Sequence, residues 1–250
     1  IGGTTRPRRF QNMASVCRNP ADNDALLREW FQHPHYDAYW QDEDCTRHFD
    51  KMNVPCFTIG SWYDFMNQGS IASFIGRQHE GGPRSRGNQW LRIGPWLHGR
   101  TNKGSKVGDV TYPENATWPV EQHMLQWFDH WLKGKQNGIE KEPHVQYYVM
   151  GATGEKSAAG NVWRAATDWP VASQQQPLYL HQGGHLLAAK PGKKKASTSF
   201  LSDPRKPMQL PGRSFPGARD ARMFEQQSEV RTFTTPVLEE NVEWTGRIHA

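Results

Sequence analysis

The fold of this chain is decided by two stretches, VPCFTIGSWYD (54–64) and QWLRIGPWLH (89–98). Each begins with a short apolar run that ends at a glycine, Gly60 in the first and Gly94 in the second, and such runs are typical of buried strands. Residues 66–79 between them carry apolar side chains at helical spacing, and the glycine-rich residues that follow predict a loop. A strand, a helix and a strand within about forty residues predict a βαβ unit that crosses over right-handed into a parallel sheet.

One more helix and then a change of periodicity are predicted beyond this unit. Residues 119–133 suit a helix, with Pro119 at its first position and Gly134 as its stop. Its apolar face is expected to consist of Met124, Leu125, Phe128, Trp131 and Leu132. Beyond Gly138 the apolar period falls toward two, which predicts strands. These strands are expected at 144–150, 177–181, 230–235 and 242–248.

The patterns predict two unequal units. We expect the last strands and helices of an α/β sheet in 1–138 and an incomplete all-β sandwich in 139–250, divided by the polar stretch GKQNGIEKEP (134–143). The expected strand 242–248 lies at the end of the chain and would leave the sandwich with an unpaired edge. We therefore expect further strands in a longer parent protein.

The first fifty residues predict one helix near 22–33, with Asp22 or Asn23 as its cap. The next residues, HPHYDAYWQDED (33–44), place two histidines beside acids. They lack the i, i+4 spacing that puts two metal ligands on one helix face, so packing and capping is their expected role. Three cysteines, an odd number without C-x-x-C spacing, predict neither a disulfide framework nor a zinc site. We expect no metal and no cofactor.

The net charge of +5 is concentrated in one stretch of the chain. Nine lysines and arginines against two aspartates lie between Lys190 and Arg222, among several prolines, which predicts a solvated loop. Aromatic residues that could stack on bases are sparse there, so we expect no nucleic-acid partner. No run approaches the ~20 apolar residues of a membrane span, so we expect a soluble protein without a membrane partner. The compartment and the formation of a homo-oligomer are left open.

The candidate chemistry lies just past the carboxyl ends of the two predicted strands, where the reactive groups of open parallel sheets gather. Asp64 follows Gly60 by four residues, and His98 follows Gly94 by four. One crossover places both on neighbouring loops, so we expect a hydrogen bond between them. Such a carboxylate fixes the imidazole tautomer while the imidazole moves a proton between nucleophile and leaving group. Taken singly, each residue suits a structural role better; as a pair they favour catalysis.

Several segments of the chain resemble the X-prolyl dipeptidyl peptidase and cocaine esterase family of serine hydrolases, from about Tyr36 to the end. They are GSWYD (60–64), GPWLH (94–98), WFDHWLKG (127–134), YVMG (148–151) and WRAATDWP (163–170). The resemblance implies an α/β-hydrolase domain with an inserted helical cap, which would end within residues 1–50. It also implies a following jelly-roll β-domain that helps to wall the active site. By the same resemblance, Asp64 and His98 are the acid and the base of a catalytic triad.

The sequence departs from this family in its serine residues, because none has the glycines of a G-x-S-x-G elbow around it. The chain order of α/β-hydrolases is serine, acid, histidine, so the nucleophile and the oxyanion donors are expected upstream. The chain starts with Ile1, and we expect a fragment that is inactive alone. The parent enzyme would hydrolyse an ester, amide or peptide bond through an acyl-enzyme. The alternative is a non-catalytic module that binds carbohydrate or a partner protein.

The substrate of such an enzyme is suggested by the neighbours of the pair. Family members that take α-amino esters carry acids just after the triad aspartate, whereas this chain has Phe65, Met66 and Asn67. The resemblance therefore implies neutral acyl groups, because an ammonium group buried without a counter-charge is costly. The aromatic residues that flank the pair in sequence are Trp62, Tyr63, Phe65 and Trp96. We expect them to line an apolar acyl pocket, with a role in the core as the alternative.

Overall fold

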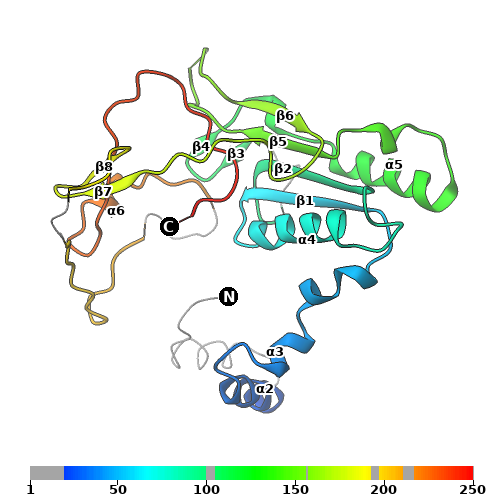
Figure 1. The fold of residues 1–250 in the computed structure, drawn as a ribbon, viewed down its shortest axis with the longest axis horizontal. Coiled ribbons are helices and arrows are strands. Elements are labelled where there is room, and N and C mark those ends of the chain that lie inside the picture. Colours follow the sequence, from blue (N-terminus) through cyan, green and yellow to red (C-terminus); the bar gives the residue numbers. More distant parts are fainter. Residues whose placement is uncertain (1–19, 100–104, 156, 193–196, 211–216, 250) are drawn as a thin grey trace.

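The computed structural model describes residues 20–99, 105–155, 157–192, 197–210 and 217–249. Its centre is a mixed sheet of four strands in the order β1-β2-β5-β6 (Figure 1). The strands are β1 (Cys56–Tyr63), β2 (Gln89–Leu97), β5 (Val145–Val149) and β6 (Val162–Ala166). The first three run parallel, and β6 pairs antiparallel with β5.

Helix α4 (Asn67–His79) joins β1 to β2, which confirms the predicted βαβ unit. The helix lies along one face of the sheet (Figure 1), and Phe74 packs there against Ile93 in a fully buried cluster. Both strands are longer than predicted, since each continues past its glycine, Gly60 or Gly94, for three residues. The candidate residues therefore follow the strand ends directly.

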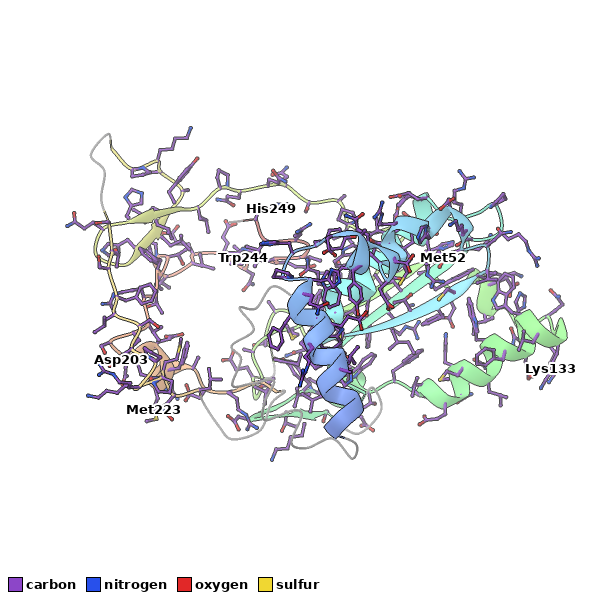
Figure 2. The ribbon with its side chains drawn as sticks, turned by 90° about the horizontal axis from the view of Figure 1, so that it is seen from below. Met52, Lys133, Asp203, Met223, Trp244 and His249 are labelled. Atoms are coloured by element: carbon purple, nitrogen blue, oxygen red, sulfur yellow. The ribbon has the colours of Figure 1, made fainter. Side chains whose placement is uncertain are left out.

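Helix α5 (Val120–Lys133) packs against the opposite face of the sheet. Trp90, which alternates with Leu91 along β2, contacts Trp127 of this helix. The helix ends at Gly134, which has the positive φ of 69° that suits glycine at a helix end. Figure 2 shows the helix extending to Lys133, at the end of the molecule opposite Asp203 and Met223.

The predicted apolar face of α5 is wrong for four of its five residues; the fifth, Trp131, packs against Trp90 and Trp127 as part of the inward-facing row. The buried positions of the helix are Val120, His123 and Trp127. The exposed apolar residues are Met124, Leu125, Phe128 and Leu132. The helix carries apolar side chains on two adjacent rows, and only contact with the aromatic surface of the sheet selects the row that faces inward.

Short elements connect the strands and helices around the sheet. They are β3 (Lys106–Val107), β4 (Val110–Thr111), and the 3-10 turns η2 (Glu114–Ala116) and η3 (Ile139–Lys141). β3 and β4 form a two-stranded antiparallel ladder soon after the end of β2. The side chains of this region pack against β5, in a cluster that contains Val107, Tyr112 and Tyr148.

The sheet continues past Gly138, the predicted boundary between the two units. β5 pairs with β2, and β6 pairs with β5, so two strands from 139–250 belong to the sheet that begins in 1–138. The division at 138 therefore does not coincide with an edge of the sheet. The physical reason is that the free side of β2 accepts β5 as a parallel neighbour, a pairing that local periodicity cannot reveal.

The β-sandwich predicted for 139–250 is not formed by the residues that the structure describes. Beyond β6 these residues contain one hairpin and one short helix: β7 (Tyr179–His181), β8 (His185–Leu187) and α6 (Arg222–Glu225). Of the strands predicted at 230–235 and 242–248, only Thr234 makes a ladder contact, an isolated bridge to His185. A strand requires a continuous neighbour for its backbone groups, and these segments lack one in the described part of the chain.

The N-terminal part contains α2 (Pro20–Gln32), α3 (Ala38–Asp42) and η1 (Cys45–Lys51). Because α2 begins at Pro20, Asp22 and Asn23 lie inside its first turn and do not occupy the cap position predicted for them. The capping role predicted for 33–44 is confirmed, since the Asp37 carboxylate accepts the Tyr39 N–H at the start of α3. His33 Nδ1 lies 2.7 Å from the same carboxylate.

The remaining predictions concern the basic stretch, metals and cysteines. The described residues from Lys190 to Ala221 form neither helix nor strand, as predicted for a loop, whereas Arg222, the last residue of the predicted stretch, begins α6. Among the residues that could be placed, no three His, Cys, Asp or Glu side chains are grouped as they would be around a metal ion. None of the described helices has the length and apolar character to span a membrane. Cys45 and Cys56 are free thiols, and Cys17 lies outside the described residues.

Candidate functional site

The site is formed where β1 and β2 end. The two strands pair in register up to Ser61 and Gly94, after which Tyr63 pairs with Leu97. β2 therefore contains one more residue than β1 over this interval, an irregularity of the β-bulge kind. The consequence is that the next residues, Asp64 and His98, emerge side by side. Without the extra residue, the chain at Asp64 would lie beside Leu97.

The predicted hydrogen bond is present between Asp64 and His98. His98 Nδ1 lies 3.0 Å from Asp64 Oδ2. The second carboxylate oxygen, Oδ1, accepts the backbone N–H of Met66 at 2.8 Å, and the Asp64 N–H donates to the Ser61 carbonyl at 3.0 Å. Asp64 therefore also has the structural role of capping its loop. Oδ1 stabilises the turn, and Oδ2 contacts the imidazole.

The exposure of the two side chains differs. The Asp64 side chain is 15% exposed and that of His98 is 54% exposed. In a catalytic pair, a mostly buried carboxylate binds one ring nitrogen of a half-exposed imidazole, and the other ring nitrogen faces the reactant. The contact occupies Nδ1 and leaves Nε2 for proton transfer. The geometry is that of a general base with its orienting acid.

Phe65 is the predicted pocket residue that the structure places at the pair. Its ring stacks on the His98 imidazole, with ring centres 5.2 Å apart and planes inclined by 26°. The residue is 60% exposed, so apolar surface is accessible beside the pair. Met66, next in the chain, is also exposed. This side of the site is therefore apolar, with the Asp64 carboxylate behind it.

The other three predicted pocket residues do not join Phe65. Trp96 is 2% exposed, and its indole N–H donates to the Ala116 carbonyl inside the core, which excludes it from a pocket surface. Trp62 packs toward Trp169 and donates to the Tyr148 carbonyl. Tyr63 points to the other face of the sheet, where its hydroxyl meets that of Tyr112. The alternative role in the core holds for Trp96, which packs against Trp118 and Trp163.

A buried ionic cluster, not predicted from the sequence, lies under α5. Arg92 of β2 donates to Glu142 at 2.9 Å and lies over the Trp118 ring. His123 Nε2 is 3.6 Å from the same carboxylate, too long for a hydrogen bond. Burial, with the nearby Arg92 charge, lowers the pKa of His123 despite the opposing effect of Glu142. The cluster joins the helix to the sheet and does not touch the Asp64–His98 pair.

Comparison with protein families matches most of the chain in two parts. Residues 3–100 match the X-Pro dipeptidyl-peptidase (S15 family), and residues 137–250 match the X-Pro dipeptidyl-peptidase C-terminal non-catalytic domain. The first match contains Asp64 and His98. The second begins beside Gly138, although the sheet continues across that position.

Individual relatives agree with these matches. The chain is 25% identical over 243 residues to the cocaine esterase of Rhodococcus sp. (strain MB1 Bresler), an alignment that covers 90% of this chain and 40% of the esterase. An aminopeptidase from the marine sediment archaeon Thaumarchaeota archaeon superposes with a TM-score of 0.63 at 22% identity, over 86% of this chain and 36% of that one. A CocE/NonD family hydrolase from Staphylococcus aureus gives a TM-score of 0.50 at 21% identity, over 74% of this chain and 30% of that one. The solved structures share the fold, and the chain spans well under half the length of each relative.

Proposed function

Because this chain belongs to the X-Pro dipeptidyl-peptidase and cocaine esterase family of hydrolases, we propose that it supplies two members of a Ser-Asp-His triad. His98 is the base and Asp64 is the acid that orients it. The observation that carries the proposal is the 3.0 Å contact between His98 Nδ1 and Asp64 Oδ2 at the carboxyl ends of two parallel strands. Nucleophile activation in such a triad requires this pairing.

The proposed reaction is hydrolysis through an acyl-enzyme. His98 Nε2 takes the proton of a serine hydroxyl while the serine oxygen bonds to the carbonyl carbon of an ester, amide or peptide. The same nitrogen then gives that proton to the departing alkoxide or amine. A water molecule repeats the sequence, with His98 first as base and then as acid, and releases the carboxylic acid. Asp64 holds the Nδ1–H throughout and stabilises the transient imidazolium.

The serine and the oxyanion donors are proposed to come from a segment that precedes Ile1 in a longer protein. No serine in the sequence has the glycines of a nucleophile elbow around it. Ser61, the serine nearest to Asp64 in sequence, is buried within β1. The alignment with the cocaine esterase accounts for 40% of that enzyme, which leaves room for such a segment.

The substrate is proposed to carry a neutral, apolar acyl group. Phe65 is exposed beside the pair, and the first residues after Asp64 contain no carboxylate that could pair with an ammonium group. An amide or ester with an uncharged acyl part avoids the cost of an unpaired buried charge.

The proposal is tested by labelling with a serine-directed fluorophosphonate, together with an ester-hydrolysis assay. The 250-residue chain alone should show neither label nor turnover, because it lacks the nucleophile and the oxyanion donors. The longer protein should show both, and His98→Ala in it should lower turnover by a factor on the order of 10⁴ or more.

Two results would contradict parts of this reading. Stoichiometric labelling of the short chain that disappears in His98→Ala would reveal a nucleophile within these 250 residues. A longer reading frame without an elbow serine would favour a non-catalytic module that binds carbohydrate or protein.

A further inference from the structure

Two tyrosine hydroxyls meet beneath the Asp64–His98 pair. The Tyr63 and Tyr112 hydroxyl oxygens are 2.7 Å apart, and the Tyr112 hydroxyl donates to Met150 Sδ at 3.2 Å. In the contact between the two hydroxyls either oxygen can be the donor. Burial raises the pKa of Tyr112, so its hydroxyl stays protonated.

Tyr63 links this contact to the site, because it directly precedes Asp64 in the chain. It is the last residue of β1 and pairs with Leu97, the last residue of β2. Asp64 and His98 are the residues that follow. Tyr63 and Leu97 both pack against the buried cluster that contains Tyr112. The two strand ends that carry the pair therefore rest on the same group of side chains.

The backbone ladder alone does not determine the position of Tyr63. The register shifts between Ser61 and Tyr63, and a bulge leaves backbone pairing locally disrupted. Side-chain contacts must then decide where the strand end lies. The contact with Tyr112 is the hydrogen bond that the structure gives the Tyr63 hydroxyl.

Tyr112 is itself held firmly. Its backbone N–H donates to the Ser105 carbonyl at 3.0 Å, and its ring meets Tyr148 of β5 edge to face at a centre distance of 6.0 Å. Tyr148 is fully buried, and its own hydroxyl donates to Asn115. Tyr112 thus connects the central strand β5, through Tyr148, to the end of the edge strand β1, through Tyr63.

We propose that Tyr112 is a positioning residue for the catalytic pair. Its hydroxyl fixes Tyr63 after the bulge and thereby keeps the Asp64 carboxylate within reach of His98 Nδ1. Tyr112 touches neither member of the pair. The inference rests on the proposed function of Asp64 and His98.

The test is the tautomer of His98, measured from its ring ¹⁵N NMR shifts at a pH where the imidazole is neutral. In the 250-residue chain the contact with Asp64 should favour the Nδ1–H form. Tyr112→Phe keeps the ring and removes the hydroxyl, so it should shift the population toward the Nε2–H form. Tyr63→Phe should do the same, and the double variant should shift it no further than either single change, because both remove one shared bond.

Tyr148→Phe is the matched control. It makes the same chemical change in the same buried cluster, but its hydroxyl bonds to Asn115 rather than to Tyr63. It should leave the His98 tautomer unchanged, and thermal unfolding of each variant verifies that the fold persists. A shift in Tyr148→Phe equal to that in Tyr112→Phe would overturn the proposal, because general loosening of the core would then explain both.

Asp64→Ala separates failure of this inference from failure of the proposed function. It should abolish the Nδ1–H preference outright. If Asp64→Ala does so while Tyr112→Phe matches the wild type, the role of Tyr112 is wrong and the pair stands. If Asp64→Ala leaves the His98 signals unchanged, the pairing itself fails, and both the proposed function and the role of Tyr112 fall with it.

Discussion

Phe65 shows how a single side chain relates the site to its substrate. Its ring stacks on the His98 imidazole, and the residue is largely exposed. An aromatic surface beside the base suits the acyl part of a substrate, because such pockets are lined mainly by apolar and aromatic groups. The same ring also restricts the motion of the imidazole. These two roles of Phe65, binding the substrate and orienting His98, can be distinguished by varying the acyl group of the substrate.

Phe65→Ala in the serine-containing protein should lower kcat/KM for an ester with an aromatic acyl group by about tenfold or more, and change it little for an acetyl ester. The reason is that only the large acyl group loses apolar contact. Steady-state kinetics with the two esters measures the difference. Met66→Ala, the removal of a neighbouring exposed side chain, is the control and should affect both esters slightly. An equal loss for both esters in Phe65→Ala would show that the ring serves mainly to orient His98.

Two glycines of α4 illustrate how packing acts on a whole element. A Cβ built on Gly76 would overlap the ring of Phe49, a buried residue of η1. A Cβ on Gly69 would meet nothing within 4 Å. Both glycines lie within the helix, so alanine improves the intrinsic helix preference at each position.

Gly69→Ala should stabilise the protein by up to about 1 kcal/mol, whereas Gly76→Ala should destabilise it, because the overlap with Phe49 outweighs the gain in helix propensity. Urea unfolding followed by far-UV circular dichroism gives both values. The two variants make the same substitution in the same helix and so control for each other. A stabilising Gly76→Ala would mean that Phe49 moves aside readily and is not a fixed contact.

His123 makes the attachment of α5 to the sheet sensitive to pH. Burial lowers its pKa in the folded protein below the ordinary value of 6.5. The unfolded chain therefore binds the proton more readily, and folding stability falls as the pH drops through 6.5 and below. Arg92 and Glu142 are the charged groups that face the ring, and they pair with each other.

His123→Phe should remove this part of the pH dependence. The new ring would lie among Phe57 and Trp118, which already contact the imidazole. Urea midpoints measured from pH 8 to pH 5 should fall more steeply toward acid in the wild type than in the variant. Parallel curves for the two proteins would show that His123 does not contribute. The other histidines are the same in both proteins, so the comparison isolates His123.

At the scale of the whole molecule, different interactions stabilise the sheet and the C-terminal region. The sheet is covered by aromatic and aliphatic clusters on both faces. In the region after β6, Glu243 connects back to the sheet by an ion pair with Arg164 at 3.0 Å and a contact with Tyr147. The described residues of the basic stretch lie mostly exposed, and none of them before Arg222 belongs to a helix or strand. Local opening should therefore be easiest in that stretch.

Limited proteolysis with trypsin should cut first between Lys190 and Arg222, where exposed lysines and arginines lie in irregular backbone. The stretch 134–143, an alternative cutting site on sequence grounds, should resist longer, because Ile139 is buried and Glu142 is paired with Arg92. Mass spectrometry of the first fragments distinguishes these sites. Initial cuts within residues 54–98 would contradict the central sheet.

The local sequence determined the βαβ unit and the position of the candidate residues. Apolar runs, glycines and helical spacing are local patterns, and they correctly predicted β1, α4 and β2. The Asp64–His98 contact followed from the same patterns, since a crossover must return neighbouring strand ends to one edge of the sheet. The loop character of the basic stretch was equally local, because proline and charge disfavour regular structure wherever they lie.

Tertiary structure alone decided what depends on a distant partner. β5 joined the sheet because β2 had a free side, and Trp96 is buried by its contacts with Trp118 and Trp163, which lie later in the chain. The row of α5 that faces inward was selected by Trp90 and Phe57, and the segments at 230–235 and 242–248 formed no sandwich without a neighbouring strand among the described residues. Hydrogen bonds between strands and contacts between side chains join residues far apart in the chain. Periodicity reports only what each segment prefers by itself, so it cannot specify which partner a segment meets.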